Sequence, residues 1–193
     1  MKQVVVISGP TGSGESTLTK EFIARYPKKV ARLVTATTRT PRLDEKSGVD
    51  YYFLTQEDFF SAEARGDILE KGYIPNRDAY YGTYKPDLDT KIAQGLIIIA
   101  NTQIVGTKYF KQEYGATTIF IMPKDVKELR ERLGARDPNI SSDELSRRLD
   151  NANAEIKDEG PFYDYNVINA DGHLSEAVDE VVAILKKEGY SFE

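Results

Sequence analysis

Apolar residues near the start of the chain follow two patterns, first that of a buried strand and then that of an amphipathic helix. Residues 4–7 are Val-Val-Val-Ile, a β-branched run that ends at a Ser-Gly-Pro sequence and predicts a buried, parallel strand. Leu18, Phe22 and Ile23 then recur with helical spacing on one face, and Pro27 ends the predicted helix. The expected order at this end of the chain is therefore strand, glycine-rich loop, helix.

The same alternation returns after residue 85. We expect helices near 86–94, 104–113 and 143–157, one after Pro123 and one along the apolar stripe of Val178, Val181, Val182 and Leu185, and strands at 96–101, 117–122 and 165–168. Strands that alternate with helices indicate an α/β fold with a parallel sheet flanked by helices. Residues 134–142 contain Gly, Pro, Asn and Ser with little apolar content, which predicts a mobile loop.

Residues 32–84 are richer in strand patterns than the rest of the chain. We expect strands at 32–38, 50–54, 67–74 and 79–84, a turn at 75–78, and a helix after Thr55, whose spacing to Asp58 resembles a capping box. This stretch is interpreted as a mixed α/β insertion on the edge of the core. The predicted organisation is a core of residues 1–35 and 91–193, an insertion at 36–90, and a smaller excursion at 134–150 within the core.

The composition is that of a globular chain, since 40% of the 193 residues are hydrophobic and 30% are charged. Lys and Arg total 26 against 31 Asp and Glu, a net charge of −5. This argues against a broadly basic surface for nucleic acid, although a local arginine cluster could bind phosphate. The longest aliphatic run, residues 96–100, is far shorter than the ~20 apolar residues of a membrane helix. With no signal peptide before the first strand pattern, we expect a cytoplasmic protein that binds neither membrane nor nucleic acid.

Cysteine and histidine usage narrows the chemistry further. The sequence has no Cys, which excludes disulfides, thiolate nucleophiles and Cys-ligated metal sites and is compatible with a reducing cytosol. Its single His, His173, excludes a multi-histidine metal site. We expect His173 to be a surface residue near the start of the last helix.

Residues 9–16 carry the clearest chemical motif. Gly-Pro-Thr-Gly-Ser-Gly-Glu-Ser has the G-x-x-x-x-G-K-[ST] frame of a phosphate-binding P-loop, between a predicted strand and a predicted helix. Glycines let backbone N–H groups point inward, and the helix N-terminus adds the positive end of a dipole. The predicted phosphate-binding residues are Gly9, Thr11, Gly12, Ser13, Gly14, Glu15, Ser16 and Thr17, with Ser16 as the hydroxyl ligand of Mg²⁺. Taken alone, the same loop could be a tight turn without a ligand.

Glu15 stands where this frame has a lysine that touches the β- and γ-phosphates. Two unit charges ~4 Å apart interact by about 4 kcal/mol at an effective dielectric of roughly 20, so exchanging attraction for repulsion is expected to weaken phosphate binding strongly. Without phosphate the exchange is mildly favourable, because the helix dipole stabilises a carboxylate in the first turn by ~0.3–1 kcal/mol.

Further motifs follow along the chain. They are Thr-Thr-Arg-Thr-Pro-Arg at 37–42, Asp-Tyr-Tyr-Phe at 50–53, Leu-Glu at 69–70, Tyr-Tyr-Gly-Thr at 80–83, Arg-Leu-Gly-Ala-Arg at 132–136 and Arg-Arg-Leu at 147–149. Together with the P-loop frame, this ordered set resembles the guanylate kinases, which move phosphate from ATP to GMP, over nearly the whole chain. The resemblance implies a P-loop core that binds ATP with Mg²⁺, a GMP-binding insertion at 36–90 and a small lid at 134–150. We expect a monomer or a homodimer.

The resemblance also implies roles for single residues. Arg39, Arg42, Tyr51 and Tyr81 would bind the GMP phosphate, Thr35, Glu70 and Thr83 would face the guanine, Asn101 would hydrogen-bond a base or a water, and Arg39, Arg136 and Arg148 would be catalytic. The chemistry agrees, because guanidinium forks match phosphate oxygens bidentately. A carboxylate can accept from both N1–H and the 2-amino group of guanine, a donor pair that adenine lacks.

Each of these residues has a simpler explanation in isolation. Arg39 and Arg42 alone would be solvated loop charges, and Tyr81 would pack within a strand. Glu70 would be an edge charge that prevents aggregation, and the lid arginines would be helix-surface charges. Only the ordered set favours a nucleotide site.

The sequence departs from the family pattern at three places. One is Glu15. Another is the strand at 96–101, where Ile99 and Asn101 replace an acidic D-x-D pattern, so that Ile99 cannot assist Mg²⁺. The third is a slightly longer segment before the Tyr-Tyr-Gly-Thr motif. The residues that would bind GMP match the family pattern better than those that would bind ATP. We therefore expect GMP to bind more tightly than ATP.

Alternatives therefore stay open at the level of sequence. Lys85, which follows the Tyr-Tyr-Gly-Thr motif, is a candidate to supply the missing positive charge. A catalytically impaired guanylate kinase fold could instead serve as a GMP- or phosphopeptide-binding module. A kinase for another small phosphorylated acceptor is disfavoured by Glu70 and by that motif.

Overall fold

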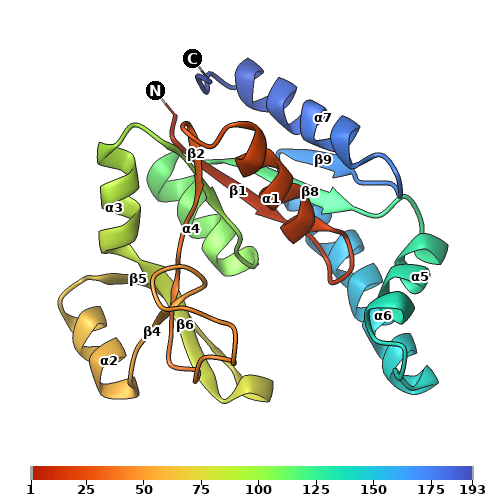
Figure 1. Cartoon of the computed structure of the whole chain (residues 1–193), viewed down its shortest axis with the longest axis horizontal. Coiled ribbons are helices and arrows are strands. Elements are labelled where there is room, and N and C mark those ends of the chain that lie inside the picture. Colours follow the sequence, from red (N-terminus) through yellow and green to blue (C-terminus); the bar gives the residue numbers. More distant parts are fainter. Residues whose placement is uncertain (1, 193) are drawn as a thin grey trace.

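The computed structural model describes residues 2–192, and the larger of its two sheets has five parallel strands (Figure 1). Its strands are β1 (Val4–Ser8), β2 (Val30–Arg32), β7 (Ile97–Ala100), β8 (Thr117–Met122) and β9 (Tyr165–Ile168), in the order β2-β7-β1-β8-β9. Every neighbouring pair in this sheet is parallel. The carboxyl ends of the strands therefore share one edge, which is where open α/β sheets bind ligands.

Helices cover both faces of this sheet. They are α1 (Glu15–Arg25) and α7 (Leu174–Lys187) on one face and α3 (Lys85–Ala93) and α4 (Ile104–Tyr114) on the other. Val5 and Ile7 of β1 pack on the first face and Val4 and Val6 on the second, so this strand is apolar at successive positions, as in central parallel strands. The predicted α/β fold is confirmed. Within residues 2–192 no helix is both long and apolar enough to cross a membrane.

A second sheet lies beside the first (Figure 1). Its strands are β3 (Ala36–Thr37), β4 (Tyr52–Phe53), β5 (Ile68–Ile74) and β6 (Ala79–Tyr84), in the order β4-β3-β6-β5, and a short 3-10 helix, η1 (Pro75–Arg77), joins β5 to β6. Helix α2 (Gln56–Ala64) packs Phe59 and Ala62 into a separate small core. The Thr55 hydroxyl accepts a 3.0 Å hydrogen bond from the backbone N–H of Asp58, which confirms Thr55 as the cap of this helix.

Close packing of β5 on β6 requires glycine at position 82. A Cβ on Gly82 would lie 2.6 Å from Ile68 Cγ2 and 2.8 Å from the backbone oxygen of Glu70, which cannot turn aside. We expect Gly82→Ala to lower the free energy of unfolding by ~1–3 kcal/mol. Gly72→Ala is the matched control, because a Cβ on Gly72 of β5 meets no atom within 4 Å. Urea unfolding measures both variants, and an unchanged G82A would contradict this packing.

The strand predicted at 32–38 is wrong. Strand β2 ends at Arg32 and β3 begins at Ala36, and the two belong to different sheets. The chain turns where the Val34 N–H donates to the Asp87 carboxylate, 3.0 Å away. Leu33 and Val34 are both buried. In the sequence, these apolar residues of the turn therefore look like part of a continuous strand.

A pair of helices, α5 (Val126–Arg136) and α6 (Ser142–Asp158), packs together below β8 and β9 (Figure 1). Their seam buries Leu129, Leu133, Leu149 and Ala152. The loop predicted at 134–142 is too long. Helix α5 ends at Arg136, three residues after the buried Leu133, and α6 begins at Ser142. The connection spans residues 137–141. The remaining predicted helices and strands agree with the structure to within a few residues at their ends.

Candidate active site

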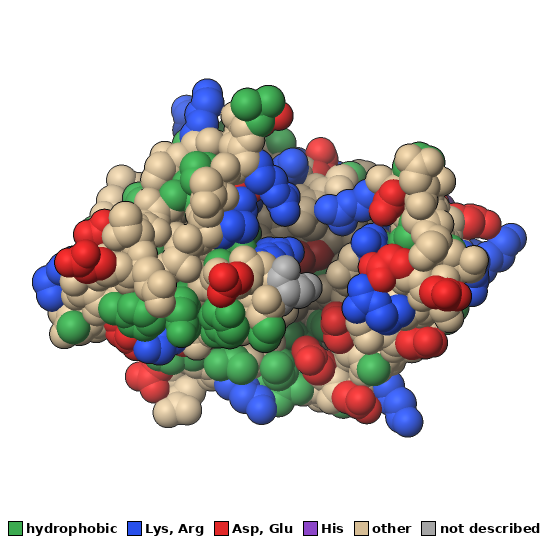
Figure 2. Space-filling model, turned by 90° about the horizontal axis from the view of Figure 1, so that it is seen from below, with side chains coloured by type: hydrophobic (Ala, Val, Ile, Leu, Met, Phe, Trp, Pro, Cys, Tyr) green, Lys and Arg blue, Asp and Glu red, His purple; other side chains and the backbone are tan. Residues whose placement is uncertain are grey.

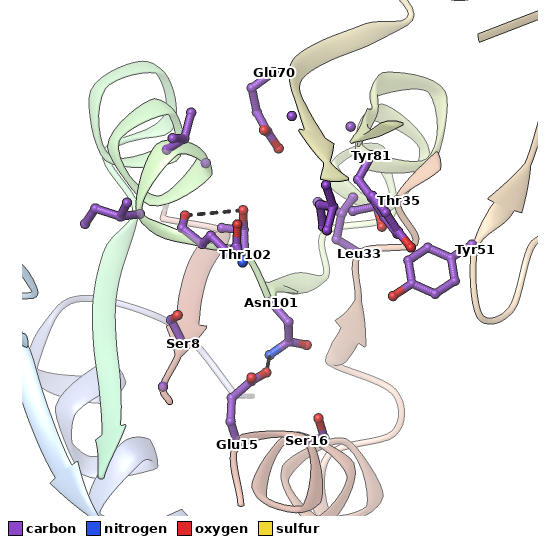
Figure 3. A pocket seen from close by; sticks show the side chains of 18 of the residues that line it. Ser8, Glu15, Ser16, Leu33, Thr35, Tyr51, Glu70, Tyr81, Asn101 and Thr102 are labelled. Atoms are coloured by element: carbon purple, nitrogen blue, oxygen red, sulfur yellow. Dashed lines mark hydrogen bonds between the residues drawn. The ribbon is translucent and has the colours of Figure 1, made fainter. Parts of the chain in front are cut away.

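A cleft of about 650 Å³ lies between the carboxyl edge of the large sheet and the small sheet. Figure 2 views the molecule from below and shows Lys and Arg side chains along the hollow between its two halves. The lining residues include Ser8, Gly9, Thr11, Glu15, Ser16 and Asn101 from one side and Thr35, Tyr51, Glu70 and Tyr81 from the other (Figure 3). Two sets of predicted site residues, far apart in the sequence, thus share one cavity.

The loop between β1 and α1 depends on its glycines. A Cβ on Gly9 would overlap the backbone oxygen of Ile121, and one on Gly14 would overlap the side-chain amide of Asn169. Gly12 and Gly14 also have positive φ angles of 93° and 84°, which L side chains rarely adopt. Gly14 is the N-cap of α1 and brings no capping side chain, so backbone N–H groups of the first turn are available to an anion.

Contacts from the other end of the chain hold this loop. The Ser13 backbone oxygen accepts from Asn169 Nδ2 at 2.9 Å and from Arg132 Nη1 at 3.0 Å. Arg132 also donates to the Asn169 backbone oxygen at 2.7 Å and is paired with Glu128 and Asp171. Sequence analysis assigned no such support to these residues, because the contacts to Ser13 span 119 and 156 positions and no local pattern signals them.

Glu15 directs its carboxylate at Asn101 (Figure 3). The Asn101 amide donates to this carboxylate and lies 3.1 Å from the Ile7 backbone oxygen and 3.2 Å from Thr19 Oγ1. Burial raises the pKa of Glu15 to about 7, although the charge of Arg32 and the hydrogen bond from Asn101 oppose the shift. The lysine position of the loop thus holds a half-buried carboxylate whose pKa lies near neutral pH. Asn101 is engaged with the donor side of the cleft, and its predicted contact with GMP stays a prediction.

Cations beside Glu15 come from places that the sequence did not suggest. Arg32 and Lys20 both line the cleft. Lys85 does not line it and instead pairs with Asp89 one turn along α3. The expectation that Lys85 supplies the missing charge is therefore wrong for this arrangement.

On the acceptor side, tyrosines and arginines gather around one point. The rings of Tyr51 and Tyr81 meet edge to face with centroids 5.8 Å apart, and the Arg39 guanidinium lies 5.6 Å from the centre of the Tyr51 ring. Arg77 Nη1 donates to the Tyr81 hydroxyl at 3.4 Å. Although burial opposes ionisation, hydrogen bonds from Arg77 and Arg39 lower the pKa of Tyr81. This group of side chains is suited to an anion, and Arg77, in the longer segment before the motif, was missed by the sequence analysis.

Arg39 has one donor without a partner. Its Nη2 makes two 2.9 Å contacts with the Glu45 carboxylate, and its Nη1 donates to the Thr40 backbone oxygen at 2.7 Å. Its Nε is buried and has no hydrogen-bond partner among the described residues. Buried donors are nearly always paired in native proteins, so an oxygen of a bound phosphate would complete the set.

Glu70 lines the cleft, and its carboxylate has one side-chain hydrogen-bond donor, Thr83. Thr83 Oγ1 donates to Glu70 Oε1 at 2.9 Å. Burial raises the pKa of Glu70, while the hydrogen bond from Thr83 acts in the opposite direction. An ionised carboxylate has about four lone-pair sites, so Glu70 retains the capacity to accept from two neighbouring N–H donors of a base.

Four predicted arginines, Arg39 among them, are not part of the cleft lining. Arg42 is exposed, and its backbone N–H donates to Glu45 at 2.8 Å. Arg136 is exposed at the end of α5. Arg148 of α6 donates from Nε to Glu144 at 2.7 Å. Their roles in phosphate binding and catalysis stay predictions. To fulfil these roles, the segments that carry them would have to move toward the cleft.

A parallel sheet with a glycine loop joining its central strand to a helix defines the class of P-loop phosphate-binding proteins. A family model described as guanylate kinase matches residues 1–188, and the chain belongs to the guanylate kinase family. It is 39% identical over 170 residues to a guanylate kinase of Thermosynechococcus vestitus, covering 88% of this chain and 86% of that one. A guanylate kinase of Geobacter metallireducens is 36% identical over 184 residues, covering 95% and 87%.

The fold agrees with this family. The crystal structure of guanylate kinase from Anaplasma phagocytophilum superposes with a TM-score of 0.71 at 26% sequence identity, covering 98% of this chain and 87% of that one. The resemblance seen in the motifs is thus confirmed in both sequence and fold.

Proposed function

We propose that this protein transfers the γ-phosphate of ATP to GMP, giving ADP and GDP. The carrying observation is the shared cleft, with the glycine loop at one side and Glu70 and the Tyr51–Tyr81 pair at the other. Relatives named guanylate kinase support the same activity. In this proposal residues 1–35 and 91–193 bind ATP, residues 36–90 bind GMP, and a lid at 134–150 closes over the phosphates.

The acceptor half would select guanine and hold its phosphate. Glu70 would accept from N1–H and the 2-amino group, while Thr35 and Thr83 flank the base. The GMP phosphate would take the free Nε of Arg39 and the hydroxyl groups of the tyrosine pair, with Arg42 reaching it from its loop. Arg77, which already donates to Tyr81, adds positive charge at the same point.

The donor half fits Mg²⁺ with ATP. This ion takes oxygen ligands and usually keeps substrate phosphates and waters among them, so one protein hydroxyl is a sufficient contribution. Ser16 offers that hydroxyl at the start of α1 and lines the cleft. When bound, the ion neutralises charge on the β- and γ-phosphate oxygens.

Transfer itself would rest on position and charge. The GMP phosphate is already largely ionised near neutral pH, so no general base is needed, and catalysis consists of alignment and charge neutralisation. Arg136 and Arg148 would join the site when the lid closes on bound nucleotide, and closure would exclude water, so that phosphate passes to GMP.

A second function is favoured by one observation, the half-buried carboxylate of Glu15 at the lysine position. It supports a GMP- or phosphopeptide-binding module with little phosphate transfer. A Glu15→Lys variant separates the two. A large gain in GDP formation would identify the present protein as impaired, whereas equal rates mean that another residue supplies the charge.

A panel of acceptors tests the proposed role of Glu70. With ATP and Mg²⁺, we expect kcat/KM for GMP to exceed that for AMP by at least about 1000-fold, since a site built to pair polar groups rejects analogues that lack them. Glu70→Gln should lower kcat/KM for GMP by roughly 100-fold, because the amide presents a donor to the guanine N–H groups. The control is Glu131→Gln on α5, because this exposed carboxylate pairs with Lys127 and neither residue lines the cleft. Similar rates with AMP and GMP would contradict the assignment.

A further inference from the structure

Arg32 stands on the wall of the donor half. It is the last residue of β2, and in the large sheet it lies in register with Ile99 of the neighbouring strand β7. It is half-buried and lines the cleft together with Glu15 and Ser16. The backbone of Arg32 thus lies beside Ile99, and its side chain shares the cleft with Glu15 and Asn101, the other two positions at which this chain departs from the charge pattern of its family.

One hydrogen bond ties Arg32 to the acceptor half. Its Nη2 donates to the backbone oxygen of Asp50 at 2.8 Å, and Asp50 directly precedes Tyr51, which lines the cleft. The Arg32 backbone is fixed as well, since its oxygen accepts from Lys91 Nζ at 2.7 Å. A guanidinium has five N–H donors in a planar fork, so the bond to Asp50 leaves donors for another anion.

The charge of Arg32 acts on Glu15. It opposes the effect of burial on this carboxylate, and an ionised carboxylate beside a triphosphate repels it unless a proton or a cation compensates. Lys20 also lines the cleft, but its side chain is exposed on α1. Arg32 is the half-buried cation, held by the bond to Asp50, and it lines the cleft together with Glu15.

We propose that Arg32 is the phosphate-binding cation of the donor site, neutralising Glu15 and acting, from strand β2, in place of the lysine of the P-loop frame. The inference rests on the proposed function, because it takes ATP as the donor. It also implies that the same side chain connects the donor loop with the segment that carries Tyr51.

Isothermal titration calorimetry measures the affinity of each nucleotide without any phosphate transfer. A non-hydrolysable ATP analogue with Mg²⁺, and separately GMP, is titrated into the unaltered protein and into R32A, R32K, K20A and R25A. We expect R32A to weaken the analogue at least tenfold and GMP less than threefold, and R32K to fall between. R25A should stay within twofold for both ligands, since Arg25 pairs with Glu21 and Asp179 and does not line the cleft. K20A, which removes an exposed cation of the cleft, should weaken the analogue less than R32A does. Retained GMP binding shows that R32A is folded.

A double-mutant cycle with Glu15→Gln tests the pairing. Once Glu15 carries no charge, replacing Arg32 by alanine should cost at least threefold less analogue affinity than it does beside the native glutamate. The proposal is overturned if the unaltered protein does not bind the analogue, or if R32A binds it normally. It is also overturned if K20A loses as much analogue affinity as R32A, or if R32A loses as much affinity for GMP as for the analogue. A cycle in which the two substitutions act independently would overturn it as well. A protein that binds both ligands as expected but forms no GDP would refute the proposed function and leave this inference standing.

Discussion

Replacing Arg39 by alanine is expected to lower kcat/KM for GMP by about 1000-fold, roughly 4 kcal/mol of lost transition-state stabilisation. The guanidinium lies against the ring of Tyr51 and hydrogen-bonds to Tyr81, and its Nε is buried without a partner among the described residues. Truncation would remove the proposed ligand of the GMP phosphate. It would also leave Glu45 without its bidentate partner. Steady-state kinetics with varied GMP measures the loss.

Two further variants make this prediction specific. Arg39→Lys keeps a charge but lacks the planar fork, so it should recover only part of the activity. Arg65→Ala removes an exposed arginine that pairs with Asp67 and should leave kcat/KM unchanged. Thermal unfolding of R39A shows whether the loss of the pair with Glu45 has disturbed the fold. A folded R39A with native kinetics would contradict the phosphate site described above.

Glu15→Gln is expected to change how stability depends on pH. The folded protein holds the proton of Glu15 up to a pKa of about 7, whereas the ordinary value is 4.5. Stability from the half-buried neutral carboxyl group is thus fully present below about pH 4.5 and is lost as the pH rises through 7. The loss amounts to about 3 kcal/mol at most. The amide cannot ionise, so the stability of the variant relative to the native protein should rise from pH 5 to pH 8.

Urea unfolding at pH 5, 6.5 and 8 measures this difference. The charged side chains that share the cleft with Glu15 are Arg32 from β2, Lys20 from α1, Glu155 and Glu159 at the end of α6, Glu70 and Lys71 from β5, and Arg77 from η1. All are present in both proteins, so their own titration cancels in the comparison. A stability difference that stays constant with pH would mean that Glu15 ionises at its ordinary pKa.

Much of the fold followed from alternation along the chain, because strands of a central parallel sheet are apolar on both faces. The runs before the glycine loop and at 96–101, 117–122 and 165–168 therefore gave correct strands. The break between β2 and β3 was missed because Leu33 and Val34 are buried and the turn is satisfied by Asp87, 53 residues away. A long-range hydrogen bond leaves no local signal.

The site divides in the same way. Tyr51, Glu70 and Tyr81 stood out because their motifs are short and ordered, and the fold brings all three to one cleft. Arg32 and Asn169 did not stand out, because each is a single polar residue at the end of a strand pattern. Their importance lies in distant parts of the chain, because Arg32 lines the cleft together with Glu15 and Asn169 donates to the loop carbonyl of Ser13.

The most direct test of the central claim follows the phosphate itself. The unaltered protein is incubated with Mg²⁺, GMP and ATP labelled in its γ-phosphate, and the nucleotides are separated. The account predicts that the label appears in the β-phosphate of GDP, that ADP and GDP form in equal amounts, and that omitting GMP stops ADP formation. Tight binding of GMP with no labelled GDP, or ADP release that is independent of GMP, would contradict it.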